Sequence, residues 1–284
     1  MRARAALIVL ALGVAGCQPD TQAAPPSANP RIVSLAPSLT EIAFAIGCGP
    51  KLVADTTFDD YPTEAARLPH VADVTHVDLE RLAKIAPTTV IALHDQETEG
   101  GPIARTLPNV SVIYLPNRRL PDLYADIDGV GEACGSVASA HALVLTMQRE
   151  IGAIATREAR VRPKPRVLYL LGLPGYVAGT QSYLSDLISI AGGVNAAQGV
   201  DEAYPDLDAE AILAADPDVL VVAHDVPFGA DVRSREPWRS LRAVHDGAVV
   251  SPPNDDIIER PGPRIIQGLR WLATALHSRA ASGG

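Results

Sequence analysis

Two His-Asp pairs are the side chains best suited to chemistry, and they occupy equivalent places in a sequence repeat. His94-Asp95 ends the stretch VDLERLAKIAPTTVIALHD, and His224-Asp225 ends LDAEAILAADPDVLVVAHD, 130 residues further on. Each pair follows an apolar run that predicts a buried strand. Because ligands of open α/β sheets bind beyond the carboxyl ends of the strands, we expect both pairs to face one cleft.

The same repeat places acidic residues at the start of a predicted helix. Asp78 and Asp208 are good N-caps, and Glu80 and Glu210 follow in the first helical turn. A carboxylate there stabilises the helix by up to about 1 kcal/mol through its interaction with the helix dipole. This effect is a purely structural explanation for both glutamates. The functional alternative is a matched pair of acidic groups on two lobes that dock on a symmetric partner.

Motifs of the common enzyme classes are missing. The chain contains no GxSxG, GK[ST], HExxH or GxGxxG pattern, and its seven histidines do not have zinc-ligand spacing. We therefore predict a protein without catalytic activity and without a resident cofactor. An alternative from a different class is a bare-cation binding protein or metalloenzyme that uses His94, Asp95, His224 and Asp225.

Strands alternate with helices in two separate parts of the chain, which predicts an α/β protein with parallel sheets. In the first part, RIVSLAP is an expected strand, followed by a helix with Ser38 as N-cap and Glu41 completing a capping box. We expect two Rossmann-like lobes at 31–125 and 163–284. The segment 126–162 lacks strands and contains a helix of about 24 residues, about 36 Å long, that joins them.

The first residues predict export rather than a folded element. Arg2 and Arg4 precede an apolar run that ends in VAGC, which is typical of a lipoprotein signal peptide over 1–16 with Cys17 as the lipidated residue. Residues 17–30 have the composition of a flexible tether. We expect an extracytoplasmic monomer anchored to a membrane by lipid. Cys48 and Cys134 form either a disulfide or two buried thiols there.

The charge of the chain excludes nucleic acid as a partner. The formal net charge is −9 over 284 residues, and no run of basic residues with interleaved aromatics occurs. A composition of 47% hydrophobic and 20% charged residues is typical of a globular protein.

Several motifs in order resemble the periplasmic substrate-binding proteins of ABC importers. They are RIVSLAPSLTEIAFAIG, FDDYP, VDLERLAKIAPTTVIA and ERPGPRIIQGLRWLATALH, within a likeness that runs from Arg31 to His277. The subfamily handles cobalamin, ferric siderophores and haem, and has a rigid helix between two lobes. The pattern is most similar to that of the cobalamin-binding members. The resemblance implies an ABC permease as partner, to which Glu80 and Glu210 would dock.

The resemblance also implies a ligand site. Tyr61, Tyr176 and Tyr204 stand where the cobalamin-binding members place aromatic rings against the corrin, which suits a large flat ligand. Asp256 and Arg260 would hydrogen-bond ligand amides.

One position departs from the cobalamin pattern. Val74 stands where those proteins carry a large aromatic residue, and His94 and His224 have no role there. Because an imidazole or a tyrosinate can ligate haem iron, haem and ferric siderophores remain alternative ligands.

Overall fold

The protein is described from a computed structural model, in which residues 30–73, 76–160 and 162–280 are described. The expected signal peptide, the lipidation residue Cys17, all but the last residue of the tether, and Val74 lie outside these ranges. Within them, no helix is long and apolar enough to span a membrane.

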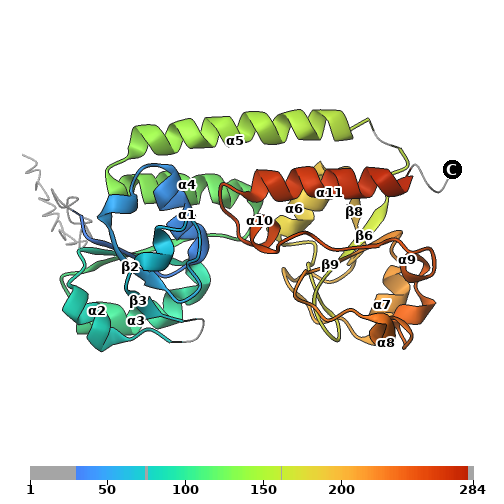
Figure 1. The fold of residues 1–284 in the computed structure, drawn as a ribbon, viewed down its shortest axis with the longest axis horizontal. Helices are drawn as coiled ribbons and strands as arrows, with labels where there is room; N and C mark the ends of the chain where they lie inside the picture. Colours follow the sequence, from blue (N-terminus) through green and yellow to red (C-terminus); the bar gives the residue numbers. More distant parts are fainter. Residues whose placement is uncertain (1–29, 74–75, 161, 281–284) are drawn as a thin grey trace, which may run out of the picture.

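The first lobe is built on a parallel sheet of five strands, in the order β3-β2-β1-β4-β5. Crossovers of the chain place helices on the faces of this sheet (Figure 1). The strands are β1 Ile32–Ser34, β2 Leu52–Thr56, β3 His70–Ala72, β4 Thr89–Leu93 and β5 Ser111–Leu115. The helices are α1 Pro37–Ala45, α2 Leu79–Ile85 and α3 Glu97–Thr106, with 3-10 turns η1 Gly49–Lys51, η2 Ala65–Arg67 and η3 His94–Gln96.

The second lobe repeats this plan in a sheet of order β10-β9-β6-β7, with β8 also pairing with β6. All its pairings are parallel except that of β7, which returns antiparallel to β6. The strands are β6 Arg166–Gly172, β7 Tyr176–Val177, β8 Val194–Asn195, β9 Val219–Val222 and β10 Val249–Val250. The helices are α6 Tyr183–Ile190, α7 Ala209–Ala215, α8 Ala230–Arg233, α9 Arg242–His245, α10 Asp256–Glu259 and α11 Ile265–Ala280, with η4 at Trp238–Ser240.

Two antiparallel helices connect the lobes. α4 (Leu120–Cys134) runs through the expected boundary at 125, and α5 (Val137–Glu158) has 22 residues, which makes it about 33 Å long. Figure 1 shows α5 lying across both lobes. The two α/β lobes joined by one long helix confirm the fold predicted from the repeat.

The hydrophobic core continues from one lobe into the other. One buried cluster contains Leu39 of α1, Ile127 of α4, Met147 of α5, Leu187 of α6 and Leu272 of α11. Each lobe also has a buried cluster of its own. Because the shared cluster would have to be opened to separate the lobes, it holds them in a fixed arrangement.

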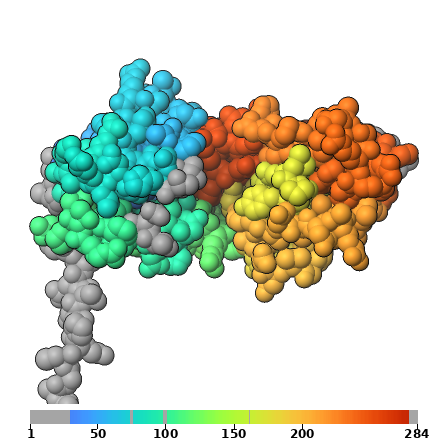
Figure 2. Space-filling view, turned by 90° about the horizontal axis from the view of Figure 1, so that it is seen from below, coloured from blue at the N-terminus to red at the C-terminus, as the bar shows by residue number. Residues whose placement is uncertain are grey.

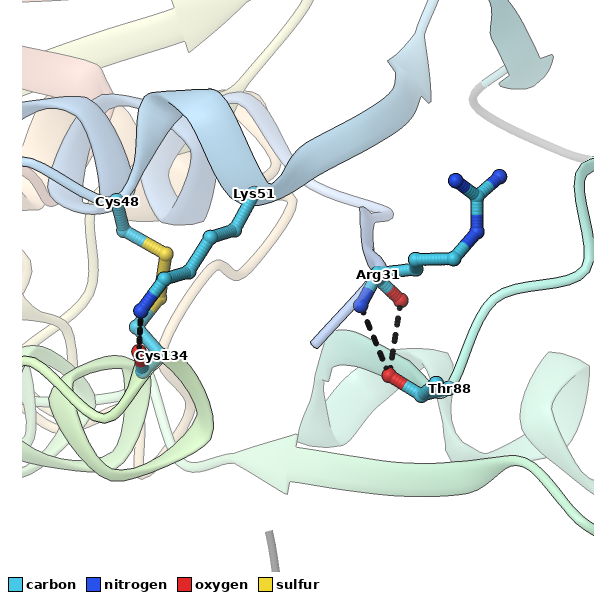
Figure 3. Close-up of a disulfide and its surroundings, with 5 residues drawn as sticks. All are labelled: Arg31, Cys48, Lys51, Thr88 and Cys134. Carbon is cyan, nitrogen blue, oxygen red and sulfur yellow. Dashed lines mark hydrogen bonds between the residues drawn. A yellow bond between two sulfur atoms is a disulfide. The ribbon is translucent and has the colours of Figure 1, made fainter. Parts of the chain in front are cut away.

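A disulfide fastens the first lobe to the connecting helices. Cys48 and Cys134 are bonded, with their Cα atoms 6.0 Å apart, and the ammonium of Lys51 donates to the carbonyl of Cys134 (Figure 3). The sequence left open whether these cysteines are bridged, because it contains no information on this separation.

The capping predictions succeed at α2 and α7 and fail at α1. Asp78 and Asp208 accept the backbone N–H groups of Arg81 and Ala211, as expected of N-caps. α1 instead begins at Pro37, one residue before the predicted cap, and no side chain caps it. Pro is favoured at the first helical position because its φ is already helical, which is the reason that Ser38 lies inside the helix.

Candidate functional site

The candidate site is a cavity of about 710 Å³ between the two lobes. Figure 2 shows the face opposite α5, where the lobes meet along a groove. Both lobes contribute to the lining, as expected for a ligand site beyond the carboxyl ends of the strands. The lining residues are Asp95, Pro116, Asn117, Arg118, Arg119 and Asp122 on the first-lobe side and Gln181, Asp201, Ala203 and Tyr204 on the second.

Two of the three tyrosines form one aromatic surface on the second lobe. The rings of Tyr176 and Tyr204 are 6.3 Å apart, and Tyr176 is 43% exposed. Burial raises the pKa of Tyr204, and the carboxylates of Glu259 and Asp95 raise it further, so its phenol stays protonated. Asp95 comes from the other lobe, so its influence on Tyr204 acts across the cleft.

The third tyrosine, Tyr61, belongs to the first lobe and lies against an arginine of the second. The guanidinium of Arg264 is 4.1 Å from the centre of the Tyr61 ring, a cation–π contact. The Tyr61 side chain remains 47% exposed. The loop before α11 thus holds a first-lobe aromatic residue in place.

Asp256 and Arg260 lie together, and Arg260 also has partners on the first lobe. Its Nε is 2.9 Å from Asp256 Oδ1, and its Nη1 is 2.6 Å from Asp60 Oδ1 and 3.7 Å from Glu41 Oε1. Glu41 in turn accepts a hydrogen bond of 2.8 Å from Arg264 Nε. Burial raises the pKa of Glu41, although its pairing with Arg264 opposes this shift.

Sequence reasoning missed this ion-pair network. Glu41 was interpreted as part of a capping box, and this assignment concealed its contact with a residue 223 positions away. The ERPGPR motif, with its two arginines, was the available signal.

Glu259, whose carboxyl group has a raised pKa, is hydrogen-bonded to two further tyrosines, and it too was missed. Glu259 Oε1 accepts from the hydroxyl of Tyr169 at 3.1 Å, and the hydroxyl of Tyr183 donates to the Glu259 carbonyl. Burial raises the pKa of Glu259 to about 8, with a further contribution from the nearby carboxylate of Asp255. At neutral pH Glu259 is therefore mostly uncharged.

The two His-Asp pairs differ in their surroundings. Asp95 lines the cavity, whereas His94 lies in η3 with Nδ1 3.7 Å from Glu97 Oε2. The His224 ring contacts the carbonyl of Pro252 at 3.2 Å, and its backbone N–H donates to Asp255. Throughout the described ranges, no three His, Cys, Asp or Glu residues gather in a way that could hold a metal ion.

Glu80 and Glu210 lie in the first turns of α2 and α7. Both helices lie on the side of their lobes opposite α5 (Figure 1). The Glu80 side chain is 82% exposed and pairs with Lys84 at 2.7 Å. Glu210 is also exposed.

Comparisons with known proteins agree with this geometry. Residues 32–255 match the family described as periplasmic binding protein. The chain is 28% identical to the vitamin B12-binding protein of Yersinia pestis over 259 residues, 89% of each chain. It is 27% identical to the uncharacterized ABC transporter substrate-binding lipoprotein YvrC of Bacillus subtilis over 254 residues, 87% of this chain and 80% of that one.

A solved structure shows the same two-lobed arrangement with ligands bound. The periplasmic heme-binding protein BhuT in complex with two hemes has a TM-score of 0.76 and 28% identity, over 87% of this chain and 99% of that one. The architecture is that of a class III substrate-binding protein.

Proposed function

The chain belongs to the periplasmic binding protein family as a substrate-binding receptor of an ABC import system, and on this premise we propose that its ligand is a cobalamin or a related corrinoid. It is a solute-binding protein and not an enzyme. The ligand would occupy the inter-lobe cleft and pass from there to the permease.

The support for this proposal is that aromatic side chains and groups able to bind amides lie where the two lobes approach each other, since Tyr204 lines the cavity and Tyr61 and Arg260 contact the opposite lobe. Tyr176 and Tyr204 offer a surface to a large flat ring, and Tyr61 offers another from the opposite lobe. Asp256 accepts and Arg260 donates hydrogen bonds, which matches the primary carboxamides around a corrin. His94 and His224 remain proposed contacts at the entrance of the cleft.

Arg260 already has a partner on the first lobe, which affects how it could contact the ligand. It is bonded to Asp60 across the cleft, so a ligand amide would replace or join that contact. Because the guanidinium has five N–H donors, it can keep Asp256 while it donates to a ligand carbonyl.

Haem or a ferric siderophore is the second candidate ligand. The observation that favours haem is the likeness to BhuT, which was solved with two hemes. Tyr61 and Tyr176 are exposed phenols, and a tyrosinate can ligate haem iron.

Calorimetric titration with cyanocobalamin, haemin and a ferric hydroxamate siderophore, beside Zn²⁺ and Mn²⁺, tests the proposal. We expect tight binding of cyanocobalamin and weaker binding of the other two chelates. Binding of the bare cations alone would overturn the proposed metal-chelate ligand. The visible spectrum of protein purified from its native host gives an independent answer, because corrinoids and haem absorb at different wavelengths.

We also propose a location and a mode of docking. Cys17 would carry the lipid that anchors the receptor outside the cytoplasmic membrane as a monomer, and mass spectrometry of the mature N-terminus tests this. Glu80 and Glu210 would form ion pairs with two related sites on the permease. The support for docking is that the helices that carry them, α2 and α7, lie on the same side of the molecule, opposite α5 (Figure 1).

A further inference from the structure

The cavity between the lobes contains polar groups that have no partner within the protein. Among the described residues, the carboxylate of Asp95, the guanidinium of Arg118 and the hydroxyl of Tyr204 make no hydrogen bond or ion pair. All three residues line the cavity, and Asp95 and Arg118 are exposed. They come from both lobes, so they surround the cavity.

The other charged groups of this cavity are already occupied. Arg119 donates to Asp186 Oδ2 at 2.9 Å, and Asp122 accepts the backbone N–H of Arg118 at 2.9 Å. Asp201 accepts a hydrogen bond of 2.9 Å from Gln181. Among the charged groups of the described lining, Asp95 and Arg118 are therefore free to exchange water for ligand groups, as is the hydroxyl of Tyr204; the buried amide oxygen of Asn117 also lacks a partner.

The side chains of Asp95, Arg118 and Tyr204 suit a neutral ligand group that both donates and accepts hydrogen bonds. A carboxylate only accepts and a guanidinium only donates, whereas a primary carboxamide does both. An anionic ligand group would be attracted by Arg118 but repelled by Asp95, and Asp122 and Asp201 line the same cavity. A bare cation would be attracted by Asp95 but repelled by Arg118.

We infer that Asp95, Arg118 and Tyr204 form a second amide-binding subsite, which holds a peripheral carboxamide of the ligand and is separate from the proposed contacts at Asp256 and Arg260. This inference rests on the proposed function. Asp95 accepts the amide N–H, while Arg118 and the protonated phenol of Tyr204 donate to the amide oxygen. The subsite makes the cleft selective for amide-bearing chelates over those bearing carboxylates.

Two corrinoids that differ in these groups test the inference. Dicyanocobinamide carries peripheral carboxamides, and dicyanocobyrinic acid carries carboxylates in their place. We expect the unmodified protein to prefer the first. Asp95→Asn should weaken cobinamide binding by up to about tenfold, because its hydrogen bond to the amide N–H is no longer charge-assisted, and should strengthen cobyrinic acid binding by removing a repulsion. Arg118→Gln should weaken both.

Asp128→Asn is the matched control, because it removes the same charge from an exposed position on α4 that does not line the cavity. Its cobinamide affinity should stay within about twofold of the unmodified protein. A preference for cobyrinic acid, or an Asp95→Asn variant that changes both affinities alike or neither, would overturn the subsite alone. Failure of the unmodified protein to bind either corrinoid would overturn the proposed ligand with it.

Discussion

Glu259 is the residue at which burial and charge conflict most directly. Its carboxyl group lies among tyrosines, near the carboxylates of Asp255 and Asp225, and its pKa is about 8. Asp255 accepts the backbone N–H groups of His224 and Asp225, which fixes the chain after β9. A proton on Glu259 therefore keeps two facing carboxyl groups from repelling each other beside the proposed ligand site.

Glu259→Gln should make the protein more stable at high pH. In the unfolded chain Glu259 ionises near pH 4.5, but in the folded protein only near pH 8. Its stabilising contribution is complete below pH 4.5, is lost as the pH rises to about 8, and then stays constant. The uncharged variant avoids this loss and keeps an oxygen for the Tyr169 hydroxyl, so its advantage above pH 8 should be of the order of a few kcal/mol.

Thermal or urea unfolding between pH 4.5 and 9 measures this difference. Asp55 and Asp126, whose pKa values burial raises to about 7, affect both proteins equally and cancel in the comparison. Glu64→Gln, at an exposed glutamate, is the control and should leave the pH dependence unchanged. An identical pH profile for Glu259→Gln and the unmodified protein would contradict the assigned protonation.

At the scale of elements, local signals were predicted well and tertiary contacts were not. Asp78 and Asp208 cap helices through backbone groups three residues away, which the sequence displays directly. The Glu41–Arg264 pair and the Cys48–Cys134 bridge join residues far apart in the chain, and only the folded structure brings them together. α1 begins at Pro37, one residue before the predicted cap Ser38, and this difference is within the usual uncertainty of helix ends.

The candidate ligand site shows the same contrast between local sequence signals, which were predicted, and tertiary contacts, which were not. The repeat placed Asp95 at the end of β4, where it does line the cavity. Arg118 and Asn117 were missed because they lie in the turn between β5 and α4, outside every repeated segment. The left-handed backbone of Asn117, with φ of 49°, shapes this turn; Asn adopts this conformation more readily than most residues, but that preference does not indicate that the turn lines a cavity.

The first turns of α2 and α7 should determine docking without affecting ligand binding. Glu80→Ala combined with Glu210→Ala removes one exposed carboxylate from each lobe, on the face opposite α5. Charges at the rim of an interface mainly govern the rate of encounter and the register of docking. We therefore expect the double variant to bind the permease about tenfold more weakly than the unmodified protein does. Added salt should weaken binding of the unmodified protein more than binding of the variant. Affinity for the ligand should be unchanged.

Surface plasmon resonance with the permease in nanodiscs measures the association, and calorimetry measures ligand affinity. Asp128→Ala with Glu132→Ala removes the same charge from exposed positions on α4 and serves as the control. If the Glu80/Glu210 variant loses ligand affinity, or if the α4 variant weakens docking equally, the proposed docking role is wrong.

On the scale of the whole molecule, the lobes are joined by more than the long helix. The shared core runs through α1, α4, α5, α6 and α11. Two ion pairs also join the lobes, between Arg119 and Asp186 and between Arg260 and Asp60. A hinge motion would have to break these contacts together, so a ligand should enter a cleft that is already formed.

Distances between spin labels on the two lobes test this rigidity. Labels at Lys84 on α2 and Ala214 on α7 report the opening of the cleft, since both positions are exposed. We expect one narrow distance distribution that shifts by less than about 2 Å when cyanocobalamin binds. Arg119→Ala should broaden it, because Asp186 loses its partner from the first lobe, while Arg105→Ala on α3 should not. Two resolved populations in the unmodified protein that interconvert on ligand binding would instead show a hinge, and the continuous core would then be weaker than its burial indicates.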